Sequence, residues 1–466
     1  MKIINKATMI SMILLLTACL SPDGNHQAES VQLENVGKAV KVNDEIVISR
    51  SQYLNKLYGF WLGQSIANWT GLVTEMDKIG GEGIHGQFYT REDWGKKDLP
   101  SIWGQGIPSN LSENINFVFE DEGGVWGSDD DTDIEYIYQH LLYSHKTSIL
   151  TAEQIRDGWL KHIYSEEQSP FGLDDEGKQQ NFLWVSNQRA HELMLKEDLL
   201  PPATSHPDNN KEYEMIDAQL TTEIFGFFAP ARPDIALKMA HLPIRTTARE
   251  NAAWAAEFYV VMYSLASLVD DTLPMKEQIQ WMANTARKQL PNHSYTAKMF
   301  DFVLARYHSG DTWEKVRDDL YQKYQVNQED GYDITAKNIY CNGCFASGIN
   351  FAASIVSLLY GEGNLVETIK IAVLSGWDSD NPAATWGGLL GFMAGKSGVE
   401  QAFNRKFADK FNIHRTRGNF LNNGIDNFNQ MAERGVSIVD RVVIDEMGGS
   451  IDTINNVWRI PNKGTL

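Results

Sequence analysis

The sequence predicts an all-α protein with one long irregular loop and a small C-terminal extension. Apolar residues recur at steps of three and four along most of the chain, the spacing of a buried helix face. Alternation of β-branched residues is scarce, and its one candidate is residues 436–443. Glycine, tryptophan and proline gather in residues 80–127, which indicates a long functional loop inside a compact domain.

The helical segments follow one another from residue 50 onward. The helical spacing is clearest in residues 53–62, 134–142, 252–269, 345–359 and 365–374. Residues 199–211, rich in proline and asparagine, indicate a loop. We therefore predict one mostly helical domain over residues 49–450, followed by a tail over residues 451–466.

Size and charge limit the classes of function. The chain has 466 residues, of which 42% are hydrophobic and 11% aromatic, enough for a sizeable core. Its formal net charge is −20. Binding to nucleic-acid phosphates depends on lysine and arginine, so this charge argues against a nucleic-acid partner. The same charge suits a soluble protein that binds cations.

The N-terminus has the pattern of an export signal. Lys2 and Lys6 precede a short apolar run, residues 7–16, which is too short to span a bilayer as a mature helix. The following residues 16–19, Leu-Thr-Ala-Cys, resemble a bacterial lipobox, in which Cys19 carries the lipid. The alternative is an ordinary secretory signal with a chance cysteine. We predict a signal peptide over residues 1–19, a flexible tether over residues 20–48, and a lipoprotein in the cell envelope, facing the periplasm or in the outer membrane.

Two further cysteines, Cys341 and Cys344, stand in a C-x-x-C pattern. In an exported protein this pattern indicates either a local disulfide or two cysteines that serve only as small residues near a helix start. A third hypothesis is redox catalysis. The sequence has no second C-x-x-C, which excludes a four-cysteine zinc site.

The strongest chemical signal is a pair of acidic clusters about 250 residues apart, at residues 128–133 and 376–381. They read Ser-Asp-Asp-Asp-Thr-Asp and Gly-Trp-Asp-Ser-Asp-Asn. One aspartate at a helix start is explained by capping and the helix dipole, but the first cluster exceeds what a cap needs. A fold that gathers several carboxylates requires a cation, and oxygen ligands suit Mg²⁺, Mn²⁺ or Ca²⁺.

These clusters resemble motifs of the ADP-ribosylglycohydrolase superfamily. The family's T-D-D-T corresponds to residues 129–132, and its G-G-D-T-D-T to residues 376–381. Its opening helix, G-x-A-x-G-D-A-x-G-x-x-x-E, corresponds without a gap to residues 63–75, where Gly63, Gly71 and Glu75 match. Residues 364–376 are similar to the family's penultimate helix. The resemblance covers roughly residues 53–395, and the three motifs occur in the family's order and spacing.

The chain also departs from the family's pattern. Asn68 replaces an aspartate, Asp129 and Asn381 replace threonines, and Trp377 replaces a glycine. The middle of the domain and residues 80–127 do not match. The resemblance therefore suggests a retained metal site with an altered substrate pocket.

The resemblance implies an orthogonal helical bundle with a centre of one or two divalent metal ions, most often Mg²⁺, with Ca²⁺ or Mn²⁺ as alternatives. The implied metal ligands are Asp129, Asp130, Asp131, Asp378, Asp380 and Asn381. Glu75 and Asp131 are the implied catalytic carboxyl groups, acting on water and the sugar. The alternative for Glu75 is a solvated charge at a helix end.

Aromatic residues crowd the opening helix and the long loop. We expect Trp69, Trp103, Trp126 and Trp377, with Asn68, to bind substrate, because aromatic faces stack on sugar rings. Core packing is an equal alternative for each tryptophan. His85 is a weaker candidate acid. Arg232 and the arginines of residues 245–249 are weaker candidates for an anionic substrate, with surface charge the alternative.

Together these features predict a metal-dependent glycoside hydrolase outside the cytoplasm. Its substrate would be a sugar of a glycan or glycoconjugate, with a furanoside among the candidates. A first alternative is an ADP-ribosyl hydrolase that acts on a modified acceptor. A second is a non-catalytic lipoprotein that binds a sugar or nucleotide, and a third is a structural metal protein.

Overall fold

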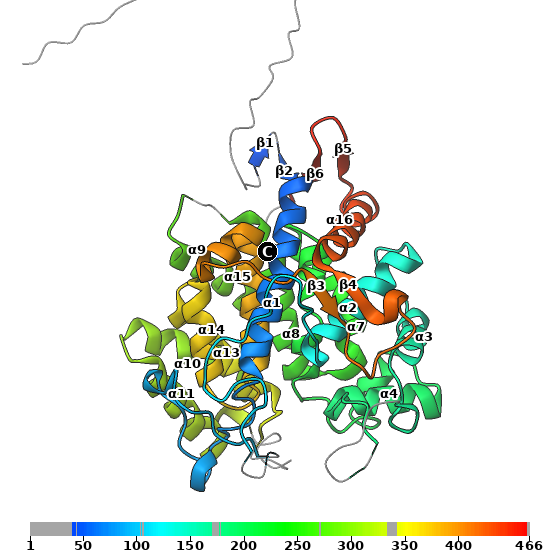
Figure 1. Cartoon of the computed structure of the whole chain (residues 1–466). Helices are drawn as coiled ribbons and strands as arrows, with labels where there is room; N and C mark the ends of the chain where they lie inside the picture. Colours follow the sequence, from blue (N-terminus) through cyan, green and yellow to red (C-terminus); the bar gives the residue numbers. More distant parts are fainter. Residues whose placement is uncertain are drawn as a thin grey trace, which may run out of the picture. The chain divides into compact units, whose positions relative to one another are not determined.

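The computed structural model describes residues 40–42, 44–102, 104, 107–169, 177, 179–269, 272–332 and 343–463. Helices dominate this part of the chain, which confirms the predicted all-α fold (Figure 1). The predicted signal peptide, the lipidation residue Cys19, Trp103 and Cys341 lie outside the described residues.

The described α-helices begin with the long α1 (Arg50–Gly71) and continue to α16 near the C-terminus. Those between them are α2 (Asp130–His145), α3 (Ala152–His162), α4 (Val185–Glu197), α5 (Asp217–Thr221), α6 (Ile224–Phe228), α7 (Pro233–Thr247), α8 (Glu250–Leu265), α9 (Met275–Ala286), α10 (Tyr295–His308), α11 (Trp313–Leu320), α13 (Ser347–Gly361), α14 (Leu365–Leu374) and α15 (Asp380–Phe403). The last is α16 (Phe428–Asp445). The segments predicted at residues 134–142, 252–269, 345–359 and 365–374 correspond to α2, α8, α13 and α14.

Helices α1 and α15 pack with their backbones in close contact along faces of small residues. A Cβ added at Gly59 would lie 2.3 Å from the backbone oxygen of Gly391, and one at Gly63 would lie 2.4 Å from that of Gly387. Non-bonded heavy atoms pack at about 3.5–4.0 Å, so larger residues would force the two helices apart. The glycines of the opening motif thus bring the end of α1 to the start of α15.

The turn after α1 is tied to the loop before α15. The Thr74 hydroxyl lies 3.0 Å from that of Ser379. The backbone N–H of Met76 donates to Trp377 O at 3.0 Å, and the N–H of Trp377 donates to Lys78 O at 2.6 Å. These bonds place Glu75 beside the second acidic cluster.

Short strands join the two ends of the described chain. One antiparallel sheet has the order β1 (Val40–Val42), β2 (Glu45–Ser49), β6 (Val457–Pro461) and β5 (Ser450–Asp452). Its β2 and β6 pair from Glu45 with Pro461 to Ser49 with Val457. A second pair, β3 (Lys410–Asn412) and β4 (Ile425–Asn427), lies in the C-terminal part.

The one candidate for a strand, residues 436–443, lies inside α16 and is helical. Its valines and isoleucines alternate locally, yet the buried positions Met431, Gly435, Val439 and Val442 recur at helical steps. One apolar face therefore packs on the core, and this packing outweighs β propensity.

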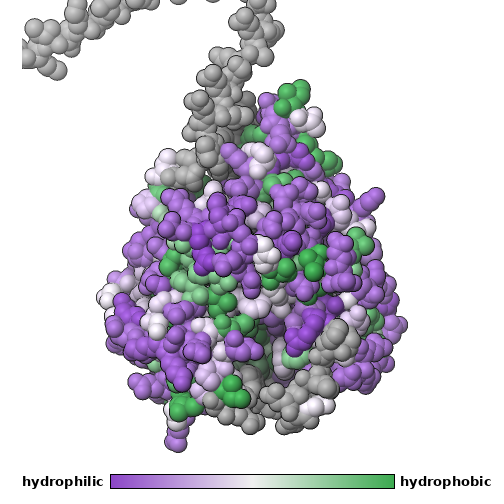
Figure 2. Space-filling view, viewed as in Figure 1, coloured by the Kyte–Doolittle hydropathy of each residue, from purple (hydrophilic) through white to green (hydrophobic). Residues whose placement is uncertain are grey.

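Residues 80–127 form the predicted irregular stretch. Within their described part, the helical segments are the short 3-10 turns Gly83–His85 and Arg91–Asp93. Hydrophilic side chains cover most of the face in Figure 2, between separate hydrophobic patches. Within the described ranges, every helix is too short or too polar to cross a lipid bilayer.

Candidate metal and active site

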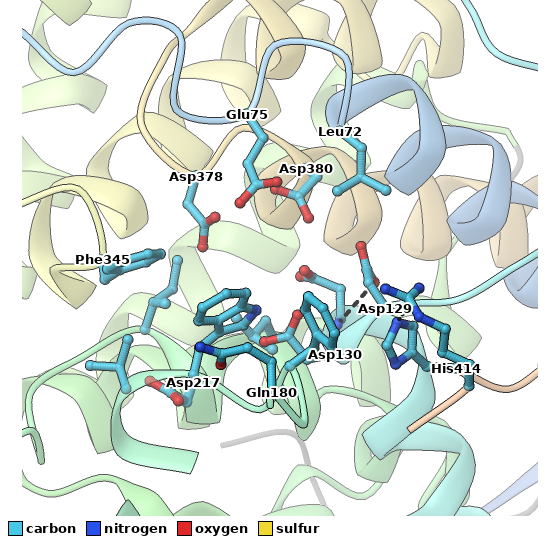
Figure 3. Close-up of a pocket in the computed structure, with 17 residues that line it drawn as sticks. Leu72, Glu75, Asp129, Asp130, Gln180, Asp217, Phe345, Asp378, Asp380 and His414 are labelled. Atoms are coloured by element: carbon cyan, nitrogen blue, oxygen red, sulfur yellow. Dashed lines mark hydrogen bonds between the residues drawn. The ribbon is translucent and has the colours of Figure 1, made fainter. Parts of the chain in front are cut away.

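A pocket of about 600 Å³ lies where α1, α2 and α15 bring their ends together. One side is acidic and carries residues of both predicted clusters, together with Glu75. Figure 3 shows Glu75, Asp378 and Asp380 on this side, with Asp217 and Gln180 across the pocket from Glu75. The distant carboxyl groups that the sequence analysis singled out therefore converge on one space.

The acidic side contains two overlapping groups of carboxylates. Glu75, Asp378 and Asp380 form the first group, in which one oxygen from each residue lies within 4.8 Å of the others. Asp129, Asp131 and Asp380 form the second group by the same measure. Because Asp380 belongs to both, the geometry has two adjacent positions where carboxylate oxygens can surround a cation.

The first cluster reaches the pocket because it begins a helix. Asp129 is the N-cap of α2, and its carboxylate accepts a hydrogen bond from the backbone N–H of Asp131 at 3.2 Å. Capping therefore explains Asp129 in part, as the sequence alternative supposed. It does not explain Asp130 and Asp131, which also line the pocket.

The second cluster precedes α15 and is held by buried neighbours. The backbone N–H of Asp378 donates to the side-chain oxygen of Asn350 at 3.2 Å. A Cβ at Gly71 would lie 2.2 Å from Cα of Asp380, so glycine is required where α1 ends against this aspartate. Asn350 is buried and gave no sequence signal.

Two buried amides hold the acidic side together. The Asn68 amide donates to both oxygens of Asp129, at 3.1 and 2.9 Å, and lies 3.5 Å from Asp380. The Asn381 amide donates to Asp131 at 3.1 Å and accepts from Gln219 at 3.4 Å. Both are fully buried. Asn68 was predicted to bind substrate and Asn381 to bind metal. In this geometry both amides instead donate hydrogen bonds to carboxylates of the acidic side.

Burial and mutual repulsion act on every carboxyl group of this side. Burial, with the neighbouring acidic groups, raises the pKa of Glu75, Asp129, Asp130, Asp131 and Asp378 well above the ordinary range. Burial also raises the pKa of Asp380. A nearby positive charge would oppose these shifts, since it favours the ionised form.

The acidic side fits a divalent cation. The ligand atoms are all oxygens, the set that hard ions prefer, and Asp380 Oδ1 is buried without a hydrogen-bond partner. Among the described residues that line the pocket, Arg415 is the only lysine or arginine. The nearby Arg417 forms an ion pair with Asp133 at 2.9 Å, where both side chains are fully buried. Asp133, which also belongs to the first cluster, thus has a positively charged partner within the protein, unlike the pocket carboxylates.

The opposite side of the pocket gave no signal in the sequence. The rest of the lining comes from Phe182 and Trp184, from Phe345 before α13, from Asp217 at the start of α5, and from His414. Phe182 and Trp184 have φ values of +51° and +50°, a costly left-handed conformation for aromatic residues. Strain of this kind persists where surrounding contacts impose it.

A C-terminal segment imposes this conformation. Arg417 donates to the backbone oxygens of Asn181 and Phe182 at 2.7 and 3.0 Å. The Arg415 guanidinium lies 4.7 Å from the centre of the Phe182 ring, and the His414 ring lies 5.4 Å from it. The C-terminal part therefore supplies one wall of the pocket.

The predicted tryptophans that the structure describes, Trp69, Trp126 and Trp377, are not among the residues that line the pocket. Trp126 and Trp377 are fully buried; the Trp126 indole donates to Ala408 O at 3.1 Å, and Trp377 packs on Phe88. Trp69 donates to Gly127 O at 3.1 Å. These tryptophans pack in the protein interior, as the alternative in the sequence analysis supposed. The aromatic rings that line the pocket are those of Phe182, Trp184 and Phe345.

The weaker candidates also have structural partners. The His85 ring lies 2.7 Å from Asp77 O, and the buried Arg232 is paired with Asp234 at 2.6 Å. Arg245 is paired with Glu257 at 2.8 Å. Cys344 is disulfide-bonded, next to the pocket residue Phe345.

The family follows from a comparison with family models. The model described as ADP-ribosylglycohydrolase matches residues 49–434, most of the chain. The chain belongs to the ADP-ribosylglycohydrolase family. This is a family of glycosyl-bond hydrolases that typically depend on metal ions, which supports hydrolase activity here.

Two other comparisons add little. A solved structure described as an ADP-ribosylglycohydrolase-related protein complex is 13% identical and has a TM-score of 0.47, with 84% of this chain and 99% of that chain covered. A search of curated proteins found no match.

Proposed function

We propose that this member of the ADP-ribosylglycohydrolase family is a metal-dependent glycoside hydrolase that acts on a neutral sugar of a glycan or glycoconjugate. The observation that supports it is the convergence of Glu75 and five aspartates on one pocket with an aromatic opposite side. Carboxyl groups of different environment supply the acid and base of glycoside hydrolysis, and aromatic rings favour sugars.

The proposed metal ligands are Asp129, Asp130, Asp131, Asp378 and Asp380. Asn381 is not among them, because its amide donates a hydrogen bond to Asp131. When bound, a divalent cation supplies a positive charge that orients sugar hydroxyls and stabilises negative charge on oxygen. Glu75, at the edge of the acidic side, would accept the proton of the attacking water as that water bonds to the anomeric carbon, and the proton would pass to the leaving oxygen as the glycosidic bond breaks. Asp131, held by Asn381 at 3.1 Å, is the proposed second carboxyl group and orients the sugar.

The charge of the pocket favours a neutral substrate. Seven carboxyl groups and one arginine are among its described lining residues. Burial lowers the pKa of His414 to about 3, so this histidine adds no positive charge at neutral pH. Even two divalent cations would not offset seven carboxylates, and the resulting negative potential disfavours an anionic group such as a diphosphate.

The second candidate is hydrolysis of an ADP-ribosyl bond, which the family match itself favours. A panel of neutral nitrophenyl glycosides, neutral oligosaccharides and ADP-ribosylated protein separates the two activities. The full chain in detergent should release sugar from a neutral substrate with Mg²⁺, lose this activity in EDTA and regain it with added metal. Release of ADP-ribose alone would overturn the glycoside proposal. Binding without any turnover would favour the non-catalytic lipoprotein.

We also propose that Cys19 carries a lipid and anchors the enzyme in a bacterial envelope membrane, from its lipobox-like setting. A Cys19→Ser variant should leave the membrane fraction and fail to incorporate a labelled fatty acid. Unchanged membrane association with no label on the parent chain would contradict this proposal.

A further inference from the structure

Asp217 stands apart from the acidic clusters and from every motif of the sequence. It is the first residue of α5, is 2% exposed, and lines the pocket. Figure 3 places it near Gln180, on the other side of the pocket from Glu75 and Asp380. Its carboxylate belongs to neither group that can hold a metal ion.

One oxygen of Asp217 has a structural role. Oδ1 accepts a hydrogen bond from the backbone N–H of Asn187 at 2.7 Å. Asn187 lies in the first turn of α4, whose N-cap residue Trp184 provides no side-chain cap. Since the first N–H groups of a helix lack partners, Asp217 takes the place of the missing cap.

The other oxygen has no such role. Oδ2 is buried and has no partner at full hydrogen-bond geometry, although weaker bonds from the Ser186 hydroxyl and from the backbone N–H groups of Ser186 and Asp217 lower the pKa of the carboxyl. The Ser186 hydroxyl is likewise without a partner at hydrogen-bond geometry. An unsatisfied buried oxygen is costly, and a cap needs only one oxygen. The second oxygen is therefore explained by a donor that arrives from the pocket.

We propose that Asp217 Oδ2 binds a hydroxyl group of the substrate, so that Asp217 selects neutral sugars by a hydrogen bond remote from the metal centre.

The chemistry of the surrounding wall identifies this donor. Phe182, Trp184 and Phe345 provide ring surfaces, which stack on sugar faces, while a carboxylate oxygen accepts from a hydroxyl. Burial raises the pKa of Asp217 to about 6, so the group is mostly ionised at neutral pH and acts as an acceptor. Since Asp217 lies across the pocket from Glu75, it contacts a part of the substrate away from the bond that breaks. This inference rests on the proposed function for the identity of the pocket as a sugar site.

The test separates the ligand role from the capping role. Asp217→Asn keeps an oxygen for the Asn187 N–H but replaces the other oxygen with a donor group. Asp217→Ala removes both. The control is Thr151→Ala, which removes another helix cap, a side chain that accepts from Gln154 N at 3.2 Å at the exposed start of α3.

Binding of neutral methyl glycosides and their monodeoxy counterparts is measured by calorimetry with Mg²⁺, in the full chain and in Glu75→Gln. We expect Asp217→Asn to weaken binding of the best glycoside about 10-fold or more, as expected for a lost hydrogen bond to a charged group. One deoxy analogue should bind the parent chain as weakly as the full glycoside binds Asp217→Asn. Asp217→Asn should bind this analogue and the full glycoside with equal affinity. Thr151→Ala should bind like the parent chain.

Equal binding by Asp217→Asn and the parent chain would reduce Asp217 to a cap and overturn the inference. Failure of every neutral glycoside to bind the parent chain would overturn it as well. Binding that depends on Asp217, without turnover of any substrate, would uphold the inference while the proposed hydrolase activity fails.

Discussion

The two sides of the pocket differ in how they are built. The acidic side comes from the ends of α1, α2 and α15, held by the glycine contacts of α1 and α15 and by the buried amides of Asn68 and Asn381. The aromatic side comes from the strained segment at residues 182–185, from α5 and from a C-terminal segment. The first side is closely packed and carries the motifs that resemble the family, whereas the second consists largely of loops, where specificity changes without loss of the fold.

The largest effect is expected from a substitution on the acidic side that removes a catalytic proton acceptor. Glu75→Gln keeps the shape of the side chain but cannot accept a proton, so kcat should fall by about 10²–10⁴-fold, the usual contribution of a general base. Binding of a glycoside should change little. The control is Glu82→Gln, on an exposed loop residue close in sequence. Normal kcat in Glu75→Gln would remove Glu75 from the mechanism.

The next test asks whether the buried carboxylate of Asp217 lowers the free energy of unfolding. Burial raises its folded-state pKa to about 6, above the ordinary value of 3.8, so between these values the folded state holds the proton. Stability is therefore lost as the pH rises from 4 through 6, by on the order of 1–3 kcal/mol in total. Asp217→Asn removes this loss. Thermal unfolding from pH 4 to 8 should show the variant gaining stability over the parent chain until about pH 7, then a constant difference.

A parallel pH profile in the two proteins would mean that Asp217 is solvated in the folded state. If Asp217→Asn is more stable than the parent chain but binds sugar more weakly, Asp217 serves function at the expense of stability.

A third test concerns the departure at Asn68. Asn68→Asp removes the amide donor to Asp129 and adds a charge between the clusters, which should destabilise the chain by about 1–3 kcal/mol in EDTA. Mg²⁺ should recover more stability in this variant than in the parent chain. Asn68→Ala loses the donor without adding charge and serves as the comparison. Equal unfolding temperatures of Asn68→Asp and the parent chain in EDTA would show that the amide does not hold the clusters together.

The smallest expected effect is on the aromatic side. Trp184→Ala should weaken glycoside binding by about 0.5–1.5 kcal/mol, the value of an aromatic contact. Trp184 is 43% exposed, and the equally exposed Trp281, at 39%, is the matched control. If Trp281→Ala weakens binding as much as Trp184→Ala, the aromatic side has no specific role.

The sequence predicted the acidic side because its residues are clustered in short motifs with a recognised order. Helix starts then place Asp129–Asp131 and Asp378–Asp380 at element ends, where they can meet. Glu75 followed from its register with Gly63 and Gly71, and the glycine contacts give the physical reason for that register.

The aromatic side was missed because nothing local marks it. Phe182, Asp217 and His414 are isolated residues in loops or short helices, joined only by tertiary contacts such as those of Arg417. The tryptophans were conspicuous in the sequence, but size and apolar surface also favour burial, and Trp126 and Trp377 took that course. The strand expected at residues 436–443 failed for a similar reason, since contact with the core decided its conformation.

The pairing of β2 with β6 has a practical consequence. Glu45 and Pro461 are direct neighbours in one sheet, although 416 positions separate them. A short peptide joining these positions would permit circular permutation, with new termini opened at an exposed turn such as the one at Gly310, between α10 and α11. Such a rearranged chain would keep the pocket while presenting a different face to any surface on which it is immobilised.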